Sequence, residues 1–310
     1  MVSPAVESQG VSANPSLEEG VTVIIPAFNE EKGIGRVLDE LRETMRASGL
    51  EHEILVVDDG STDGTAEIAR RQGVKLLSHK TNTGYGGALK TGILHAKYPL
   101  VVITDADGTY PNEHIPELVQ MVARGEADMA VGARTGESVA ISWVRRPAKW
   151  VITRLAELAA GRRIPDLNSG LRVFRREVVL RFFSLLPSGF SFTTTITLAM
   201  LTNGYTVEYL SIDYHERKGR SKIKPFQDTI NFVLLILKIA LYFAPLKIFL
   251  PLSGVLLLLG LGVGLYTLLV VGRLADVITM LLALTAAQIG AIGLLAELIN
   301  KRFPTNYRNG

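Results

Sequence analysis

The sequence predicts an α/β domain built on a parallel sheet and followed by two membrane-spanning helices. Short, fully apolar segments alternate with helical patterns through the first third of the chain, which is typical of a parallel sheet covered by helices on both faces. Nearer the C-terminus, Ile248 to Gly272 and Val277 to Ala296 contain no charged residue, and each run reaches the roughly 20 residues that cross a bilayer.

The strands are expected at the apolar segments. These are "VTVIIPAF", "EILVVDD", "VKLLSH" and "LVVITDAD", at 21–28, 53–59, 74–79 and 100–107. A first helix is expected from about Glu30, with Asn29 as its N-cap, and further helices near Thr65 and Gly87. Helical spacing assigns one buried face of the first helix to Ile34, Val37, Leu38, Leu41 and Met45.

The chain is expected to have five parts. They are a disordered tail at 1–20, a cytosolic head at 21–225, an interfacial amphipathic helix at 226–247, a two-helix transmembrane hairpin at 248–300 and a cytosolic tail at 301–310. The segment from 230 to 246 is assigned to the interface because Lys238, near its centre, would cost about 3 kcal/mol inside the bilayer. The basic segment at 215–224 and the basic tail belong on one side of the membrane, so an even number of crossings is expected. The prediction is a multi-pass protein of the cytoplasmic membrane with its head in the cytosol.

Composition excludes several classes of site. The chain has no cysteine, so a disulfide framework, a thiolate nucleophile and a cysteine zinc site are impossible. Its five histidines stand far apart, without metal-ligand spacing. The glycines of "NTGYGGAL" lack the G-x-G-x-x-G spacing, and no acidic ribose ligand follows, which argues against a dinucleotide-binding oxidoreductase.

Polar motifs follow three of the predicted strands. They are "PAFNEE", "DDGSTDGT" and "DADGTYP", and parallel strands would bring them to one rim of the sheet, where ligands bind. Asp63 also fits a simple Asx turn leading into a helix. Asp105 and Asp107 are one residue apart, and desolvating two carboxylates this close is costly unless a cation or a set of donors offsets it. The pair therefore predicts a bound partner at the rim.

These motifs resemble a known family. Their order, followed by "GAR" at 132–134 and "DLNSGLR" at 166–172, is similar to glycosyltransferase family 2 of the GT-A fold, and within it to the polyprenyl-phosphate glycosyltransferases. The resemblance covers about residues 20 to 300. It implies a nucleotide-sugar donor linked to UDP or GDP, Mg²⁺ or Mn²⁺, and an inverting transfer to a polyprenyl phosphate such as undecaprenyl or dolichyl phosphate. It also implies a homo-oligomer, and nucleic acid is not an expected partner.

Site residues follow from the resemblance, position by position. It implies that Asp105, Asp107 and Asp166 are catalytic and that Asp107 and Thr109 hold the metal, although many relatives have Gln where this chain has Thr109. Asp166 is interpreted as positioning the sugar or an arginine rather than as a base. The residues implied to bind the nucleotide sugar are Pro26, Ala27, Asn29, Glu30, Asp58, Asp59, Asp105 and Ala106.

Cations are needed to bring an acceptor phosphate up to a donor diphosphate. The candidates for the lipid phosphate are Arg134, Arg145, Ser169, Arg217 and Lys222. Two of these assignments have ordinary alternatives: Arg145, with Arg146, also fits a solvated helix start, and the loop with Arg217 and Lys222 also fits a positive-inside flank. Where many relatives carry an acidic residue, this chain has Thr193, Thr194 and Thr195, which are expected to cap a helix.

Three other functions fit parts of this sequence. A processive polysaccharide synthase shares the head but usually carries a Q-x-x-R-W motif, which "RRPAKW" does not supply. A membrane-anchored glycosyltransferase acting on a soluble, glycan or protein acceptor remains the alternative. A non-catalytic lipid-binding module would tolerate loss of the acidic motif, yet that motif is intact.

Overall fold

The computed structural model describes residues 20–135, 153–189 except 155 and 159, 191–214, 234, 241, 245–273 and 276–302. Residues 1–19 of the tail predicted at 1–20, most of the predicted interfacial helix and the boundary at residue 225 lie outside these residues, whereas Gly20 is described and buried. The described residues fall into two units: one holds 20–135, 170–181 and 206–214, and the other holds the remainder. Each unit is described by itself.

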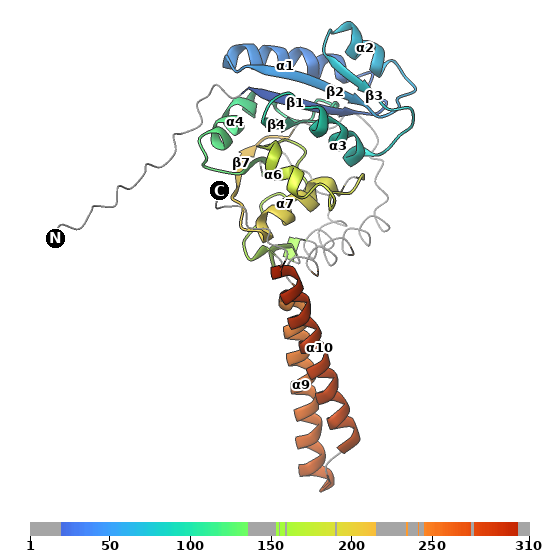
Figure 1. Cartoon of the computed structure of the whole chain (residues 1–310), viewed down its shortest axis with the longest axis vertical. Helices are drawn as coiled ribbons and strands as arrows, with labels where there is room; N and C mark the ends of the chain where they lie inside the picture. The colour runs from blue at the N-terminus through green and yellow to red at the C-terminus, as the bar shows by residue number, and fades with distance from the viewer. Residues whose placement is uncertain are drawn as a thin grey trace, which may run out of the picture. The chain divides into compact units, whose positions relative to one another are not determined.

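The first unit is a seven-stranded mixed sheet with the order β3-β2-β1-β4-β6-β5-β7 (Figure 1). The predicted parallel pairing of the first four strands is confirmed, whereas β6 runs antiparallel to both β4 and β5 and was not predicted. The strands are β1 (Val21–Ala27), β2 (His52–Asp58), β3 (Lys75–Ser78), β4 (Leu100–Ile103), β5 (Met129–Arg134), β6 (Arg172–Arg175) and β7 (Val207–Ile212).

Helices cover both faces of this sheet, as predicted. Alternate residues of β1 divide between the faces: Val21, Val23 and Ile25 join the core with α1 and α4, whereas Ile24 lies under Gly92 of α3. The helices are α1 (Ile34–Ser48), α2 (Thr65–Arg71), α3 (Tyr85–His95), α4 (Ile115–Ala123), preceded by the 3₁₀ turn η1 (Asn112–His114), and α6 (Arg176–Arg181). The predicted apolar face of α1 is fully buried.

The start of α1 differs from the prediction. The helix begins at Ile34 with Gly33 as its N-cap, not at Glu30 with Asn29 as its cap. Asn29 adopts a left-handed backbone conformation, with φ 56°, and its carboxamide accepts a hydrogen bond from the Thr62 N–H at 2.8 Å. The side chain therefore joins two loops instead of capping a helix.

The second unit contains helix α7 (Phe192–Thr202) and a helical hairpin. The hairpin consists of α9 (Leu246–Tyr266), which continues as the π-helical turn η3 (Thr267–Val271), and α10 (Asp276–Arg302). Leu246–Val271 and Val277–Ile299 are long and apolar enough to span a membrane, in agreement with the two predicted spans. Only 11% of each span is buried inside the chain, whereas the core helix of a soluble protein would be mostly buried.

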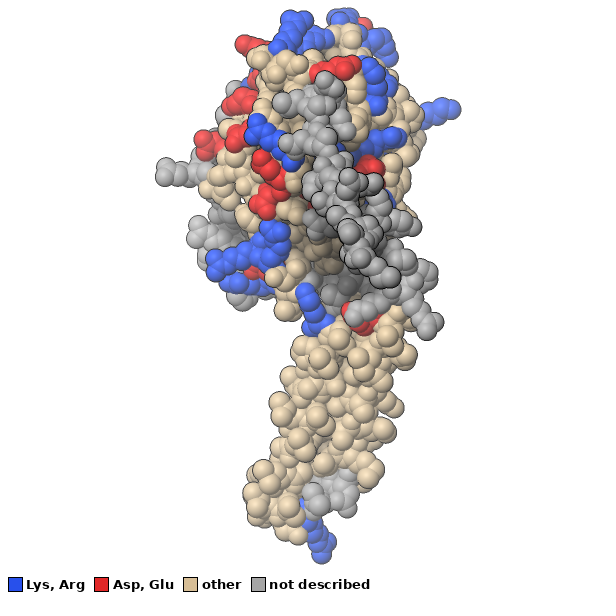
Figure 2. Space-filling model, turned by 60° about the vertical axis from the view of Figure 1, so that its left-hand side comes forward, with Lys and Arg blue, Asp and Glu red and all other residues tan. Residues whose placement is uncertain are grey.

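The two spans pack closely where small residues allow it. A Cβ added at Gly260 would lie 3.1 Å from Cβ of Leu282, and one added at Gly293 would lie 2.6 Å from Cβ of Phe249. The Ser253 hydroxyl donates a 2.7 Å hydrogen bond to the Ala286 carbonyl. Figure 2 shows that the surface of the hairpin carries no Lys, Arg, Asp or Glu along most of its length.

Candidate active site

The carboxyl ends of three neighbouring strands form the rim on which the polar motifs meet. Ala27, at the end of β1, pairs with Asp58, at the end of β2, and Ile24 of β1 pairs with Ile103 at the end of β4. Pro26 and Ala27 are buried in β1, so their backbone shapes the rim. The topology thus brings the three predicted motifs to one edge of the sheet.

The loops after β1 and β2 are joined by hydrogen bonds. The buried Asp58 carboxylate accepts the Ser61 N–H at 3.1 Å, and the Asn29 N–H donates to the Ser61 hydroxyl at 3.0 Å. The Glu30 N–H donates to the Thr65 hydroxyl at 2.8 Å. Asn29, Glu30 and Asp58, which are predicted to contact the nucleotide, are thereby held in place on one side of the rim.

Asp63 forms the Asx turn that its sequence context fits. Its Oδ1 accepts the N–H of Thr65 at 3.0 Å, and its Oδ2 accepts the N–H of Glu31 at 3.2 Å. The carboxylate thereby starts α2 and connects it to the loop after β1.

Asp59 anchors the start of α3. Only 3% of the residue is exposed, and Oδ1 accepts hydrogen bonds from the Thr83 N–H at 2.9 Å, the Thr83 hydroxyl at 2.7 Å and Nδ1 of His79 at 2.7 Å. Oδ2 accepts the Gly84 N–H at 2.8 Å. Burial raises the pKa of Asp59, but the hydrogen bonds from His79, Thr83 and Gly84 together outweigh it and hold the pKa below its ordinary value. The carboxylate is therefore charged and engaged with protein donors.

The first residue of α3 reaches the acidic motif. The Tyr85 hydroxyl donates to Oδ1 of Asp105 at 3.1 Å. Burial, and then the charge of Asp105, raises the pKa of Tyr85 well above its ordinary value, so the hydroxyl keeps its proton and remains a donor. On the other side of this carboxylate, a Cβ added at Gly170 would lie 2.9 Å from Oδ2 of Asp105. Glycine at position 170 thus lets the backbone approach the aspartate.

A chain of contacts links Tyr110 to Arg134 through Tyr214. The Gly170 N–H donates to the Tyr110 hydroxyl at 2.6 Å, and the Tyr110 ring meets the ring of Tyr214 edge-on at 5.3 Å between centroids. The Arg134 guanidinium lies over the Tyr214 ring, 5.3 Å from its centroid. The predicted phosphate-binding Arg134 is thereby held at the end of β5 by aromatic side chains that the sequence reasoning did not consider.

The loop that carries Asp107 is clamped from two directions. The Thr109 hydroxyl and N–H donate to Oδ1 of Asp107 at 2.6 and 3.1 Å. Arg36 of α1 donates to the Gly108 carbonyl at 3.2 Å. At the start of α1, a Cβ added at Gly33 would lie 2.7 Å from the carbonyl oxygen of Ala106, so the loop packs directly against this glycine.

The donor set fits a hard divalent cation. Asp105 and Asp107 are half-buried, and with Thr109 they offer only oxygen atoms, which Mg²⁺ and Mn²⁺ prefer. Among the described residues, no group of three or more His, Asp or Glu side chains could hold a metal. Mg²⁺ is usually held by one or two carboxylates and completed by water and substrate phosphates, so a pair of aspartates suffices when a diphosphate is also bound.

Asp166 and Ser169 belong to the second unit. Both are buried, and Oδ1 of Asp166 accepts the Asn168 N–H at 3.1 Å. The Asn168 carboxamide in turn accepts a hydrogen bond from the Thr194 hydroxyl on α7. These contacts fix Asp166 within its own unit.

The threonines of α7 are not caps. Thr193, Thr194 and Thr195 lie inside the helix, for which Ser191 is the N-cap, and the Thr195 hydroxyl donates back to the Ser191 carbonyl at 2.9 Å. The helix is buried on all sides, and the hydroxyls of Thr194 and Thr195 bond to Asn168 and to the helix backbone rather than to water. The remaining predicted phosphate ligands, Arg145, Arg217 and Lys222, lie outside the described residues.

Sequence reasoning missed Tyr85, Tyr110, Tyr214 and Arg172. Arg172 is fully buried on β6, where it pairs with Ile103 of β4 and Val131 of β5. No local signal marks it, because β6 has the sequence "RVFR" and so carries an arginine at each end, whereas arginine side chains are almost never fully buried unless they are paired. The tyrosines gave no signal either, since aromatic residues beside a core usually only fill space.

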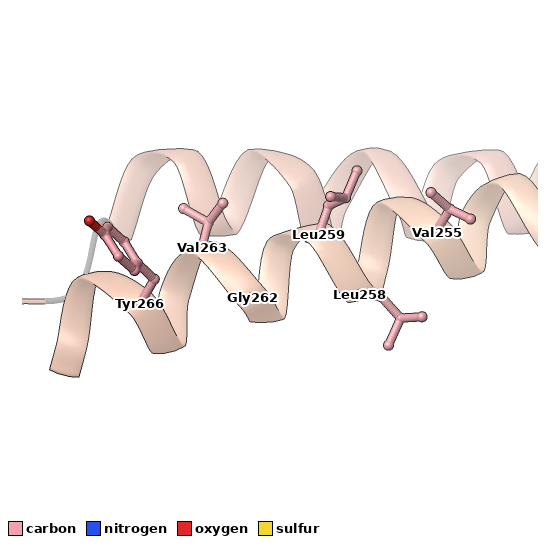
Figure 3. Close-up of a pocket in the computed structure, with 6 residues that line it drawn as sticks. All are labelled: Val255, Leu258, Leu259, Gly262, Val263 and Tyr266. Carbon is pink, nitrogen blue, oxygen red and sulfur yellow. The ribbon is translucent and has the colours of Figure 1, made fainter. Parts of the chain in front are cut away.

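A groove on the hairpin is lined almost entirely by apolar side chains. It is lined by Val255, Leu258, Leu259, Gly262, Val263 and Tyr266 of α9 (Figure 3). These residues lie within a predicted span and offer a single hydroxyl.

Comparison with known proteins places these features in a family. Residues 22–183 match the family described as Glycosyl transferase family 2, and residues 244–301 match the GtrB C-terminal hairpin. A dolichyl-phosphate hexose transferase of Haloferax volcanii is 32% identical over 209 residues, which cover 67% of this chain and 88% of that protein. A low-salt glycan biosynthesis hexosyltransferase of the same organism is 29% identical, and the match covers 70% of this chain but only 53% of that protein.

Solved structures show the same fold. Glucosyl-3-phosphoglycerate synthase from Mycobacterium tuberculosis, crystallised with Mn²⁺, UDP and glucosyl-3-phosphoglycerate, superposes with a TM-score of 0.59 at 20% identity, covering 76% of this chain and 86% of that chain. Mannosyl-3-phosphoglycerate synthase from Rubrobacter xylanophilus superposes with a TM-score of 0.56 at 21% identity, covering 72% and 73%. The head therefore has the GT-A type of mixed sheet.

Proposed function

Because the chain belongs to glycosyltransferase family 2, we propose that it moves a sugar from a nucleotide-sugar donor to a polyprenyl phosphate at the cytosolic face of a membrane. The glycosyltransferase activity follows from the family. The lipid-phosphate acceptor is the proposed part, and one observation carries it: an acidic GT-A rim and a helical hairpin long and apolar enough to span a membrane occur in one chain. The printed name of the Haloferax relative, a dolichyl-phosphate hexose transferase, supports the same acceptor.

On the donor side, we assign the diphosphate to the rim around Asp105 and Asp107. A divalent cation bound there would neutralise the diphosphate and stabilise the leaving nucleoside diphosphate. The Thr109 hydrogen bonds hold the Asp107 carboxylate in one orientation, and the Tyr85 hydroxyl does the same for Asp105. Mn²⁺ and UDP in a structural neighbour support a metal-dependent nucleotide donor of this kind.

The base and ribose of the donor are proposed to lie against Pro26, Ala27, Asn29, Glu30 and Asp58. Their backbones are fixed by the hydrogen bonds between the loops after β1 and β2, so this wall needs little rearrangement when a nucleotide binds. Ala106, packed against Gly33, is proposed to contact the nucleotide through its backbone.

On the acceptor side, the proposal needs no side chain as an obligatory base. A phosphate monoester has its second pKa near 6, so it is mostly dianionic at pH 7 and arrives deprotonated. Arg134, Arg145, Ser169, Arg217 and Lys222 are proposed to hold this phosphate. Asp166 is proposed to position the sugar or an arginine. If so, the rate at saturating donor rises with acceptor ionisation between about pH 5 and 7 in both the wild type and Asp166→Asn. Loss of that acidic limb in the variant would identify Asp166 as the base.

The proposed topology has two crossings with both flanks in the cytosol. Reporter fusions after Leu246, in the turn at 272–276 and after Gly310 should read inside, outside and inside. A reporter after Gly310 that reads outside would mean that the segment from 230 to 246 also spans the bilayer.

The decisive experiment supplies membranes containing the protein with a panel of labelled UDP- and GDP-sugars and then extracts the lipids. The proposal expects label from one donor to move into the organic phase, to be lost with EDTA and to return with Mg²⁺ or Mn²⁺. Asp107→Ala is the matched inactive control, and its chain should remain folded because Asp107 is not part of the core. Label that stays in the aqueous phase as a new glycoside would instead establish a soluble acceptor.

A further inference from the structure

An arginine in the first turn of α1 contacts the loop that carries the acidic motif. Gly33 is the N-cap of α1, so Arg36 is the third residue of the helix. A cation is disfavoured at this end of a helix, because the helix dipole is positive there. The position of Arg36 is therefore explained by what its guanidinium contacts and not by the needs of the helix.

The guanidinium has two partners among the described residues. Its Nη2 donates to the Gly108 carbonyl at 3.2 Å, and its Nε lies 3.3 Å from a carboxylate oxygen of Glu40, one turn further along α1. A Cβ added at Gly108 would overlap Nη2. The φ of Gly108 is 71°, in the left-handed region that favours glycine. Glycine at position 108 thus lets the guanidinium lie directly against the loop.

The bonded carbonyl determines the direction of the next N–H. The Gly108 carbonyl and the Thr109 N–H belong to one planar peptide group, and in a trans peptide the two point in opposite directions. Because Arg36 holds the carbonyl on one side, the N–H is turned toward Oδ1 of Asp107, to which it donates at 3.1 Å. If this peptide group rotated by half a turn, Asp107 would lose the N–H and would face the carbonyl oxygen instead.

We propose that Arg36 is a positioning residue for the acidic rim: it holds the peptide group between Gly108 and Thr109 so that Asp107 presents its carboxylate to a divalent cation. The role toward the cation rests on the proposed function, whereas the hold on the peptide group does not. Arg36 does not bind the metal itself, since a guanidinium has no acceptor. The charge of Arg36 alone would weaken cation binding by repulsion, so positioning and simple repulsion predict opposite effects when Arg36 is replaced.

The test variant is Arg36→Met, which removes the donor and the charge but keeps a long, unbranched side chain. Because 57% of the Arg36 side chain is exposed, the variant should fold, which an unchanged circular dichroism spectrum verifies. Arg36→Lys keeps the charge and a single donor group. Arg42→Met is the matched control, because it removes an arginine of the same helix that contacts Asp39 and Gln72 and not the loop.

Two measurements are made on the full-length proteins in detergent. Hydrogen exchange of the peptides that cover residues 106–110 is followed by mass spectrometry. Binding of Mn²⁺ in the presence of UDP or GDP is followed by the loss of the electron paramagnetic resonance signal of free Mn²⁺. Neither measurement depends on turnover, so a loss of activity for another reason does not affect them.

Arg36→Met is expected to speed exchange at 106–110 about three- to tenfold and to raise the Mn²⁺ concentration for half-saturation by a similar factor, as for the loss of one partly exposed hydrogen bond. Arg36→Lys should recover part of both effects, and Arg42→Met should change neither. Tighter Mn²⁺ binding by Arg36→Met would show simple repulsion and overturn the positioning role. Exchange or Mn²⁺ binding equal to that of the wild type would overturn it as well.

The proposed function and this inference can fail separately. If the wild type binds no Mn²⁺ with either nucleotide, the proposed metal-dependent donor site is wrong. The exchange rates of residues 106–110 in Arg36→Met still decide whether Arg36 holds the peptide group.

Discussion

Replacing Asp59 by asparagine should destabilise the head, because this carboxylate organises the start of α3. Asparagine can keep an oxygen near Thr83 and His79, but it places an NH₂ group against the Gly84 N–H, which now lies 2.8 Å from Oδ2. One buried donor then loses its acceptor, at about 1–3 kcal/mol, and the bonds to the other oxygen lose their charge assistance. We expect a total loss of about 2–4 kcal/mol in the free energy of unfolding.

The assay is thermal unfolding of the purified full-length protein in detergent, followed by circular dichroism. For a unit of this size, the expected loss corresponds to a Tm lower by about 5–10 °C. Glu67→Gln is the matched control: it removes the same charge from a carboxylate that bonds Arg70 and Arg71 at 2.9 Å on the exposed surface of α2. That ion pair is screened by solvent, so Tm should not change measurably.

The effect of Asp59 should also depend on pH in one direction. Its pKa is lowered in the folded chain, so its contribution is fully present above the unfolded value near 3.9 and is lost as the pH falls through the folded value. The difference in Tm between wild type and Asp59→Asn should therefore be constant from pH 6 to 8 and shrink below about pH 4. If Asp59→Asn keeps the wild-type Tm but no longer binds the nucleotide, Asp59 is a ligand and the anchoring role is refuted.

Three further substitutions test the rim. Tyr85→Phe removes a hydrogen bond to a charged group and should lower the rate at saturating donor about tenfold with an unchanged circular dichroism spectrum; a wild-type rate would contradict this. Thr109→Val should raise the Mg²⁺ concentration that gives half-maximal activity, and Thr109→Ser should restore it; an unchanged metal dependence in the valine variant would remove Thr109 from the site. Gly33→Ala places a Cβ 2.7 Å from the Ala106 carbonyl and should lower both activity and Tm, at about 1–3 kcal/mol, whereas Gly189→Ala, with no atom within 4 Å of the new Cβ, should be tolerated.

The sequence predicted the fold where local signals and tertiary structure agree. The strands β1, β2 and β4 are built on the apolar runs "VIIPA", "ILVV" and "LVVI", and the buried face of α1 follows helical spacing, so local sequence patterns located them. The strand β6 has only four residues, "RVFR", and two of them are arginines, so its pattern did not mark it as a central strand. Its position between β4 and β5 is decided by pairing with residues far away in the sequence.

The site was predicted less completely, because exposure and partners cannot be read from a motif. Asp58 and Asp59 look equivalent in "DDGS", and both are buried, but their partners differ. Asp58 accepts a hydrogen bond within its own loop, whereas Asp59 accepts hydrogen bonds from the start of α3, more than 20 residues later. Tyr85 was considered only as part of a glycine-rich stretch, since its partner Asp105 is separated from it by 20 residues. Asn29 was expected to cap a helix because it precedes a helical pattern, but its contact with the loop after β2 and its left-handed backbone conformation cannot be read from the local sequence.

The interleaved strand order has a consequence for synthesis and folding. The strand β6 lies between β4 and β5, so these two strands lack their shared neighbour until residues around 172 have been made. The strand β7 pairs with the other side of β5 and is complete only at Ile212. Contacts of such large sequence separation form late, so the sheet should close as one cooperative step after β7 has left the ribosome rather than strand by strand. The first candidate span begins only at Leu246, which means that the seven strands of the described sheet are synthesised before either apolar helix of the hairpin. Chains truncated between β5 and β7 should therefore expose an unpaired edge and aggregate, whereas chains truncated after Tyr214 should retain a complete sheet.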